Sequence, residues 1–310
     1  MSPFHHIPVM LKEVLSGLAL QVGGVYVDGT LGGAGHAEAI LDQTSPSGRL
    51  FGFDRDGVAL EAAEKRLARF GDRVQLHRAN FAEMGRYLAK ASCDGVLLDL
   101  GVSSPQLDES ERGFSFRQDG PLDMRMDQRQ KLTAEQIVNQ YEVEELARIF
   151  WEYGDERDSR RIARAIVMDR QARKFERTSQ LAGLIERVLP RGGQKTHPAT
   201  RVFQALRIAV NEELGSLSEG LKAAVEILKP GGRLVVITFH SLEDRMVKNF
   251  GKKLALDYES PGEVDVPELR KPVKPMLKLI TRKALQPSEE EQRENVRSRS
   301  AQVRVMERNN

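Results

Sequence analysis

The sequence predicts an α/β protein in which helices cover both faces of a doubly wound, mostly parallel sheet. Short apolar segments alternate with amphipathic segments of helical period in units of about 30 residues, which is typical of consecutive β–α–β units. A turn dense in glycine follows the first apolar segment, between Asp28 and His36. Two segments near the C-terminus alternate apolar and polar side chains, which favours an antiparallel pair at one sheet edge.

The individual elements follow from these patterns in order. A helix over 8–18 precedes the first strand at 25–28, and the glycine turn leads into a helix that ends near 41. The second strand covers 49–53 and ends at Asp54, after which Asp56 is expected to cap a helix over 57–70. We expect further strands at 74–77, 95–98 and 233–239. Helices are expected over 198–214, from there to 228, and over 241–254. The antiparallel pair is expected at 277–282 and 302–307, with an exposed charged connection at 287–299 between its strands.

The alternation stops between 107 and 201, where the sequence indicates no strand. A loop rich in glycine, arginine and aspartate over 113–127 precedes segments of helical period at 134–139, 143–153, 157–173 and 179–188. The sequence therefore predicts two domains. Residues 1–107 and 202–310 form the domain with the sheet, and 108–201 form an all-helical insertion of about 95 residues, a size typical of a small domain.

Composition limits the classes of protein that fit. Charged residues make up 30% of the 310 residues and nearly balance, giving a formal net charge of +2, so any nucleic-acid surface must be local. The single cysteine, Cys93, excludes a disulfide within the chain and a site of several thiolates, and we expect it to be buried and inert. No histidine has the spaced partners of a zinc site, so no metal is expected. Because no long apolar run occurs, we expect a cytoplasmic protein.

Three of the expected strands end in an acid: Asp28, Asp54 and Asp99. Open parallel sheets bind ligands beyond the carboxyl ends of their strands, and a carboxylate about twenty residues after a glycine loop commonly accepts the hydroxyls of a ribose. We therefore interpret Asp54 as a ribose ligand rather than a helix cap, while Phe81 could flank an adenine or belong to the core. Glu38 stands where a dinucleotide fingerprint needs its third glycine, which disfavours a nicotinamide cofactor.

This combination fits a methyltransferase that uses S-adenosylmethionine, because that cofactor has no pyrophosphate for a third glycine to accommodate. Six long motifs then resemble one family, the bacterial 16S ribosomal RNA cytosine-N4-methyltransferases. The resemblance runs nearly end to end, is poorest over 257–275, and includes the closing segment 297–301. The motifs begin at Asp28, Leu98, Arg112, Gly120, His197 and Phe239 and read DGTLGGAGH, LDLGVSSPQLD, RGFSF, GPLDMRMD, HPATRVFQALR and FHSLEDR.

The resemblance implies a class I methyltransferase fold of Rossmann-like architecture with a helical insertion that helps to hold RNA. It implies methyl transfer from S-adenosylmethionine to N4 of a specific cytosine in the decoding centre of 16S ribosomal RNA. In the implied cofactor site Asp54 binds the ribose, Phe81 lies on the adenine side, and Asp99 and Gln106 complete the site. The methionine end of the cofactor is expected to contact the loop residues Gly32, Gly33, Ala34, Gly35 and His36.

The chemistry requires a group that holds the cytosine amine in line with the methyl group, because delocalisation of its lone pair makes that nitrogen a weak nucleophile. Other amino-methyltransferases place an Asp/Asn-Pro-Pro-aromatic motif after the fourth strand. This chain has Asp99 there, followed by the loop residues Ser103, Ser104 and Pro105. We expect Asp99 or a carbonyl of this loop to accept a hydrogen bond from N4.

Three further residues leave alternatives open. His240, after the fifth strand, could contact substrate directly or serve the local structure. Ser241 with Asp244 has the form of a capping box, so we expect Ser241 to cap the following helix. His36 could lie beside a ligand or could simply begin a helix.

The helical insertion carries the local basic surface that the overall charge lacks. Its members are Arg157, Arg161 and Arg164 on one face of an expected helix, and Arg191, Lys195, His197 and Arg201 in a loop. A single group of basic residues on a helix is usually just a face exposed to solvent. Two such groups together favour contacts with RNA phosphates. The expected partner is 16S ribosomal RNA within the small ribosomal subunit, and a homodimer is an open alternative.

Three alternative functions stay open at this stage. The chain could methylate another RNA or DNA base amine, which analysis of product nucleosides would reveal. It could be a cofactor-binding ribosome-assembly factor whose methylation is incidental, which an inactive variant that still supports assembly would favour. It could also be a nicotinamide-dependent oxidoreductase, which failure to bind S-adenosylmethionine would favour.

Overall fold

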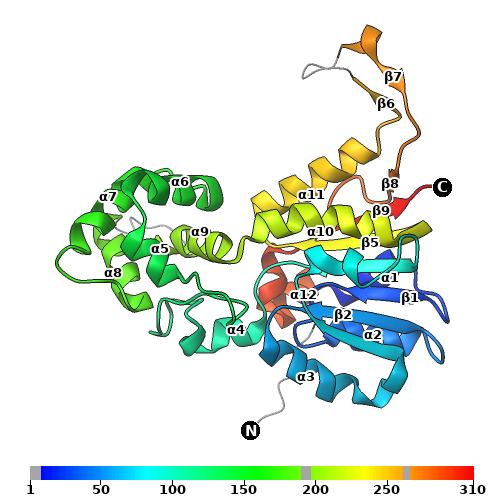
Figure 1. The fold of residues 1–310 in the computed structure, drawn as a ribbon, viewed down its shortest axis with the longest axis horizontal. Coiled ribbons are helices and arrows are strands. Elements are labelled where there is room, and N and C mark those ends of the chain that lie inside the picture. The colour runs from blue at the N-terminus through cyan, green and yellow to red at the C-terminus, as the bar shows by residue number, and fades with distance from the viewer. Residues whose placement is uncertain (1–7, 190–196, 261–265) are drawn as a thin grey trace. The chain divides into compact units, whose positions relative to one another are not determined.

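The computed structural model describes residues 8–189, 197–260 and 266–310, and it divides the chain into two compact units (Figure 1). The first unit combines Met1–Gly101 with Gly215–Asn310, and the second is the intervening segment Val102–Leu214. The sequence analysis ended the helical insertion at 201, whereas the second compact unit runs to 214 and so includes one more helix.

A seven-stranded sheet forms the centre of the first unit, in the order β3-β2-β1-β4-β5-β9-β8. The first five strands in this order pair in parallel, and β9 pairs antiparallel with both β5 and β8, as expected from the sequence. The strands are β1 (Val25–Asp28), β2 (Arg49–Asp54), β3 (Val74–Arg78), β4 (Cys93–Asp99), β5 (Leu228–Thr238), β8 (Leu277–Leu279) and β9 (Gln302–Arg308).

Helices cover both faces of this sheet because successive side chains of a strand point to opposite sides. Tyr26 of β1 packs into a core with α1, α2 and α3, whereas its neighbour Val27 packs into a second core with α10 and α11. The doubly wound architecture predicted from the alternation of elements is therefore confirmed. The helices are α1 (Leu11–Leu18), α2 (Gly35–Gln43), α3 (Gly57–Leu67), α10 (Glu213–Ile227) and α11 (Ser241–Leu254).

Local hydrogen bonds define where several helices of the first unit begin. Asp56 caps α3 as expected, since its side chain accepts from the N–H of Val58 at 3.1 Å. The helix expected to reach residue 70 ends at Leu67 and continues as the 3-10 helix η1 (Ala68–Arg73). The 3-10 helix η2 (Phe81–Arg86) begins at a cap formed by Asn80.

The second unit is helical, and no strand occurs among its described residues. Its core is built from apolar side chains such as Ile137, Phe150 and Leu206. Arg157 precedes α7 instead of lying within it, so the expected helix over 157–173 is too long at both ends. The elements are α4 (Ser104–Asp108), η3 (Ser110–Arg112), α5 (Ala134–Gln140), α6 (Val143–Gly154), α7 (Ser159–Asp169), α8 (Thr178–Val188) and α9 (Ala199–Asn211).

The C-terminal part of the first unit is more ordered than the sequence suggested. The strands β6 (Tyr258–Glu259) and β7 (Lys271–Pro272) pair within 257–275, where the sequence indicated no strand, and η4 (Pro267–Leu269) lies between them. The connection at 287–299, expected to be exposed throughout, contains α12 (Glu289–Glu294) and η5 (Val296–Ser300), and Ser298 is fully buried.

None of the helices described is long and apolar enough to cross a membrane.

Two glycines of α10 provide a test of how this helix packs against Phe81. A Cβ at Gly220 would lie 2.4 Å from the ring of Phe81, whereas a Cβ at Gly215 would meet nothing within 4 Å. We expect Gly220→Ala to lower the free energy of unfolding by about 1–3 kcal/mol because the ring must move. Gly215→Ala is the matched control, and we expect it to stabilise the helix by about 0.5–1 kcal/mol. Urea denaturation measures both, and equal effects at the two positions would contradict this packing.

Candidate active site at the carboxyl ends of the strands

Three carboxyl groups lie at one edge of the parallel sheet. Asp28, Asp54 and Asp99 end the adjacent strands β1, β2 and β4. Asp28 pairs in register with Gly52 of β2 and Leu97 of β4, two residues before each of those strands ends. The three side chains therefore converge at the edge where open parallel sheets bind ligands.

Asp54 connects the glycine loop to the start of α3. Its Oδ2 accepts from the N–H of Gly32 at 2.9 Å, and its Oδ1 accepts from the N–H of Asp56 at 2.9 Å. Burial raises the pKa of Asp54, and these two N–H donors partly offset that effect. Since Asp56 caps α3, Asp54 is not the helix cap, and each of its oxygens retains a lone pair for a ligand hydroxyl.

Asp28 is almost completely buried, with 1% of its surface exposed. Its Oδ1 accepts from the N–H of Thr30 at 3.1 Å. Burial raises the pKa of Asp28 to about 7, the N–H of Thr30 opposes this shift, and the nearby Asp54 adds to it. A substantial fraction of Asp28 is therefore neutral near pH 7.

Asp99 has the least satisfied carboxyl group of the three. Its Oδ1 is buried and makes no hydrogen bond within the described part of the chain. Its Oδ2 lies 3.6 Å from Nε2 of His36, which is itself buried. Burial raises the pKa of Asp99 well above its usual range, and the carboxyl groups of Asp28 and Glu243 raise it further. The site thus combines acidic groups whose ionised forms are disfavoured with an oxygen available to a ligand.

The glycine loop holds its shape through its backbone and through α3. Gly32 has a φ of 48° and Ala34 a φ of 59°, and α2 begins at Gly35. Arg66 of α3 donates to the carbonyl of Gly33 at 2.9 Å and pairs with Glu38 at 2.8 Å. Glu38, the residue that replaces a third glycine, therefore helps to anchor the loop. A Cβ at Gly33 would meet nothing within 4 Å, so the loop is open there.

Phe81 follows β3 and packs against α10. Its ring lies where a side chain at Gly220 would stand, and its surface is only partly buried. Phe81 is thus anchored on one side by the core and retains some exposed surface. The structure is compatible with both readings that the sequence left open.

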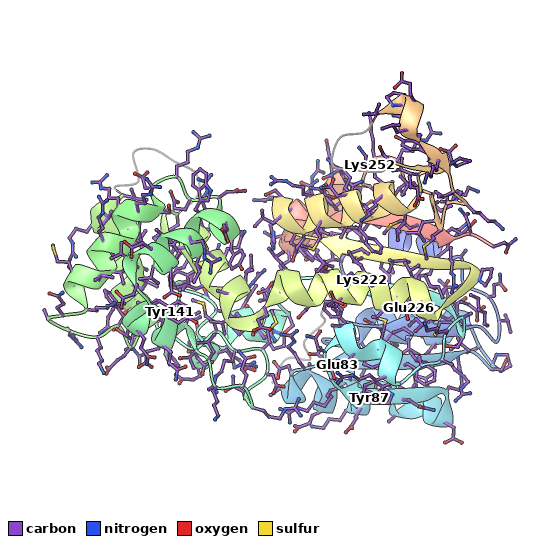
Figure 2. All side chains as sticks on the ribbon, turned by 45° about the horizontal axis from the view of Figure 1, so that its top comes forward. Glu83, Tyr87, Tyr141, Lys222, Glu226 and Lys252 are labelled. Atoms are coloured by element: carbon purple, nitrogen blue, oxygen red, sulfur yellow. The ribbon has the colours of Figure 1, made fainter. Side chains whose placement is uncertain are left out.

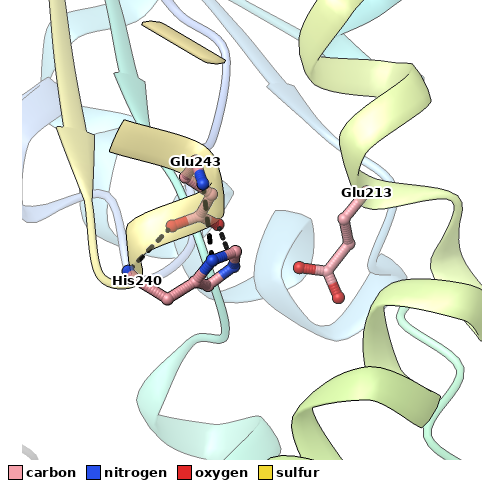
Figure 3. A group of neighbouring side chains, drawn as sticks. All are labelled: Glu213, His240 and Glu243. Atoms are coloured by element: carbon pink, nitrogen blue, oxygen red, sulfur yellow. Dashed lines mark hydrogen bonds and ion pairs between the residues drawn. The ribbon is translucent and has the colours of Figure 1, made fainter. Parts of the chain in front are cut away.

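His240, and not Ser241, caps α11 (Figure 3). Nδ1 of His240 accepts from the N–H of Glu243 at 3.4 Å, and Oε2 of Glu243 accepts from the N–H of Phe239 at 2.9 Å. The expected cap by Ser241 is wrong because the capping box begins one residue earlier. Asp244, assigned to that box, instead binds Arg304 at 2.6 and 3.0 Å. The ring of His240 has a structural role, and its contact with substrate stays a prediction.

The remaining residues expected near the cofactor belong to the second unit. Ser103 precedes α4, and its N–H donates to Oε1 of Gln106 at 3.0 Å. Gln106 is 5% exposed, and Pro105 lies in the first turn of the same short helix, with Ser104 at its first position. Their expected roles in catalysis and cofactor binding stay predictions.

The basic residues of the second unit differ in their surroundings. Arg157, Arg161 and Arg164 are all exposed, as a phosphate-binding face requires. His197 is instead held internally, since Nε2 lies 2.7 Å from Oε1 of Glu186 and the ring lies against Phe116. Arg201 is exposed and donates to the carbonyl of Asp155 at 3.4 Å. Lys195 and Arg191 lie outside the described residues.

Two residues at this edge escaped the sequence analysis. Thr30 joins β1 to β4, because its Oγ1 accepts from the N–H of Asp99 at 2.6 Å while its own N–H binds Asp28. Arg66 holds the glycine loop from a helix more than thirty positions away in the chain. Thr30 lies inside the glycine motif and could have been noticed there, whereas no local signal marks Arg66.

The sheet order, with antiparallel β9 inserted between β5 and β8, and the acidic carboxyl edge define a class I methyltransferase fold. The comparison with protein families agrees with this class. Residues 3–309 match the MraW methylase family, and the chain belongs to that family.

Curated relatives match over nearly the whole chain. A protein named ribosomal RNA small subunit methyltransferase H from Geobacter sulfurreducens is 53% identical over 310 residues, covering 98% of this chain and 99% of the relative. A protein of the same name from Symbiobacterium thermophilum is 50% identical over 308 residues, covering 98% and 96%. Among solved structures, an rRNA methylase from Streptococcus thermophilus is 11% identical, covers 99% of each chain and has a TM-score of 0.44.

The raised pKa of Asp28 predicts a specific dependence of stability on pH. Between its usual value of 3.8 and about 7, the folded protein holds the proton of Asp28 more tightly than the unfolded chain. This carboxyl group therefore stabilises the fold at low pH and loses that contribution as the pH rises through this window, by at most about 1.4 kcal/mol per unit.

We expect Asp28→Asn, which keeps the oxygen that accepts from Thr30, to become steadily more stable relative to the unaltered protein from pH 4 to pH 7. Urea denaturation at several pH values measures this difference. A difference that does not change with pH would contradict the assigned pKa.

Proposed function

We propose that this chain transfers a methyl group from S-adenosylmethionine to the exocyclic N4 of one cytosine of 16S ribosomal RNA, at position 1402 in the decoding centre. The cluster of Asp28, Asp54 and Asp99 is the observation that carries the proposal. Their raised pKa values show that the ionised forms of these carboxyl groups are disfavoured in the free protein, and a cationic ligand would stabilise those forms. Membership of the MraW methylase family and the full-length relatives named as ribosomal RNA methyltransferases support the choice of reaction and substrate.

The residues at the carboxyl edge fit S-adenosylmethionine. Asp54 has a free lone pair on each oxygen for the two ribose hydroxyls, and Phe81 has exposed ring surface for the adenine. The loop residues Gly32, Gly33, Ala34 and Gly35 offer backbone groups without bulky side chains to the methionine end, and the ring of His36 follows them. Oδ1 of Asp99 is the unsatisfied buried acceptor that a ligand ammonium or amine would satisfy. Gln106 keeps its proposed place in the cofactor site.

Methyl transfer to this amine depends on alignment more than on activation. When bound, S-adenosylmethionine supplies an electrophilic methyl group on a cationic sulfur. The chain has to hold the amine nitrogen at about 3–3.5 Å from its target and in line with it. An acceptor placed beside the N–H groups achieves this, and it also raises the electron density on the nitrogen.

We assign this acceptor role to Asp99, with a carbonyl of Ser103, Ser104 or Pro105 as the alternative. The ionised form of Asp99 accepts hydrogen bonds with both oxygens, and positive charge in the site favours that form. His36 lies beside this carboxyl group, with Nε2 at 3.6 Å from Oδ2. Asp99 or water then takes the proton that the methylated amine loses. His240 follows β5 at the same edge and is assigned as a further substrate contact.

RNA binding is assigned to the exposed arginines of the second unit. Arg157, Arg161 and Arg164 are available to phosphates, and Lys195, His197 and Arg201 are the further candidates. Such contacts fix the position of RNA without reading its sequence. The target cytosine must be single-stranded or extruded so that its N4 can enter the site.

The product identifies the reaction directly. Labelled S-adenosylmethionine is incubated with isolated small ribosomal subunits from a strain that lacks this methylation, with naked 16S RNA and with unrelated RNA. Each RNA is digested to nucleosides and analysed by mass spectrometry. We expect N4-methylcytidine from the small subunits and none from the unrelated RNA.

The other outcomes distinguish the alternatives. Product from naked 16S RNA as well would mean that the recognised structure is local to the RNA. A methylated adenosine or a DNA product would identify another base amine as the acceptor. Measurable binding of S-adenosylmethionine without methylated product from any substrate would contradict the proposal and favour a docking role in ribosome assembly.

Asp99→Asn tests the role of the carboxyl group. The amide keeps the shape of the side chain but can neither carry the charge nor take a proton. We expect turnover to fall by about 100-fold or more, measured with saturating S-adenosylmethionine. Asp72→Asn, which alters an exposed carboxyl group of the same unit, is the matched control and is expected to leave turnover unchanged. Near-normal turnover of Asp99→Asn with normal cofactor affinity would remove Asp99 from the mechanism.

A further inference from the structure

We infer that the first unit has its own binding groove for RNA phosphates, separate from the candidate active site and from the arginines of the second unit. This inference rests on the proposed function, because RNA is the ligand. The groove, called here the α11 groove, lies among α11, β8, β9 and the residues after β8. It is a small hollow that is partly open to solvent. Its polar lining residues are Lys248, Lys252, Thr281, Arg282 and Arg304.

The lining of the α11 groove is strongly cationic. Four of its side chains carry positive charge, and no carboxyl group is among the residues that line it. Arg304 is 9% exposed and is neutralised by Asp244, to which it donates two hydrogen bonds. Lys248, Lys252 and Arg282 remain, and Lys252 and Arg282 are exposed. Three cations around one hollow concentrate positive potential that a surface of balanced charge would not have.

The floor of the groove is closely packed. A Cβ at Gly251 would lie 2.7 Å from Sδ of Met306 and 3.1 Å from Cδ2 of Leu279, so this glycine lets α11 lie close to the sheet. The hydroxyl of Thr281 accepts from the N–H of Val305 at 2.9 Å. Its own proton is thereby available to a phosphate oxygen. The groove therefore offers a hydroxyl donor beside its cationic side chains.

The position of the groove suits RNA that is bound for reaction. The helix α11 begins at Ser241, directly after the carboxyl end of β5, and with about 1.5 Å per residue Lys248 and Lys252 lie roughly 10 and 16 Å along it. These distances correspond to a few nucleotides of a strand. A strand whose target base enters the site can thus place its flanking phosphates over Lys248, Lys252 and Arg282.

The lining chemistry favours the RNA backbone over the bases. No aromatic ring is among the lining residues, so stacking of an unpaired base has no platform there. Lysine and arginine side chains bind phosphates in any sequence. The α11 groove therefore contributes affinity and orientation, and it leaves the choice of cytosine to the active site and the RNA fold.

The test replaces the three uncompensated cations together, as Lys248→Gln, Lys252→Gln and Arg282→Gln. Binding of small subunits that lack the methylation is measured over a series of salt concentrations. We expect the dependence of log affinity on log salt to lose about 2–3 units of slope, and affinity at low salt to fall about tenfold or more. Affinity for S-adenosylmethionine, measured by calorimetry, should stay unchanged because the altered residues lie outside its site.

The matched control removes three positive charges elsewhere on the same unit, as Lys65→Gln, Lys90→Gln and Lys222→Gln. Lys222 lies on α10, whereas Lys252 lies on α11 (Figure 2). We expect this control to keep most of the affinity and slope. Equal losses in both triple variants would mean a general charge effect and would overturn the groove.

The outcomes separate the inference from the proposed function. If the unaltered protein methylates cytosine and the α11 variant binds with unchanged slope, only the groove is overturned. If the unaltered protein yields no methylated cytidine, the proposed function fails, and with it the choice of RNA.

A second measurement does not depend on the triple variant. Cys93 is buried and is the chain's single cysteine, so Lys252→Cys can carry a photo-crosslinker alone at the surface. We expect crosslinks to nucleotides within a few positions of the target cytosine, and crosslinks confined to distant RNA would contradict the groove.

Discussion

The convergence of three carboxyl groups on one sheet edge, one of them fully buried and two partly buried, is the constraint on which this site depends. Parallel pairing of β1, β2 and β4 brings Asp28, Asp54 and Asp99 together, although each carboxyl group would be better solvated in water. Burial and mutual repulsion disfavour their ionised forms, and only a few backbone N–H groups compensate. The fold thus gives up stability at this edge, and a ligand with positive charge recovers it.

The rest of the first unit keeps this edge in place. Arg66 connects α3 to the glycine loop and to Glu38, so the loop is supported from outside its own strand–loop–helix unit. Thr30 fixes the ends of β1 and β4 to each other. The close approach of Phe81 to Gly220 joins the far side of the site to α10. Each contact links elements that are distant in sequence, which makes the geometry of the edge a property of the whole sheet.

The sequence predicted the elements whose signals are local. The mostly parallel sheet with its antiparallel pair, the strand-end acids and the cap by Asp56 all follow from periodicity and from residue type at a boundary. Ser241 was chosen as a cap because its pattern matched, but the structure uses His240, and backbone geometry decides between neighbouring candidates. Arg66 and the α11 groove could not be predicted, because they depend on contacts between segments that only the folded sheet brings together.

The central claim is that a cationic cofactor binds at this edge and ionises carboxyl groups that burial keeps partly protonated in the free protein. Calorimetry of S-adenosylmethionine binding at pH 7, in buffers of different ionisation enthalpy, tests it most directly. The account predicts a net release of protons on binding and an affinity that increases from pH 6 to pH 8, because positive charge lowers the raised pKa values of Asp28 and Asp99. Binding without proton exchange and with an affinity independent of pH would contradict it.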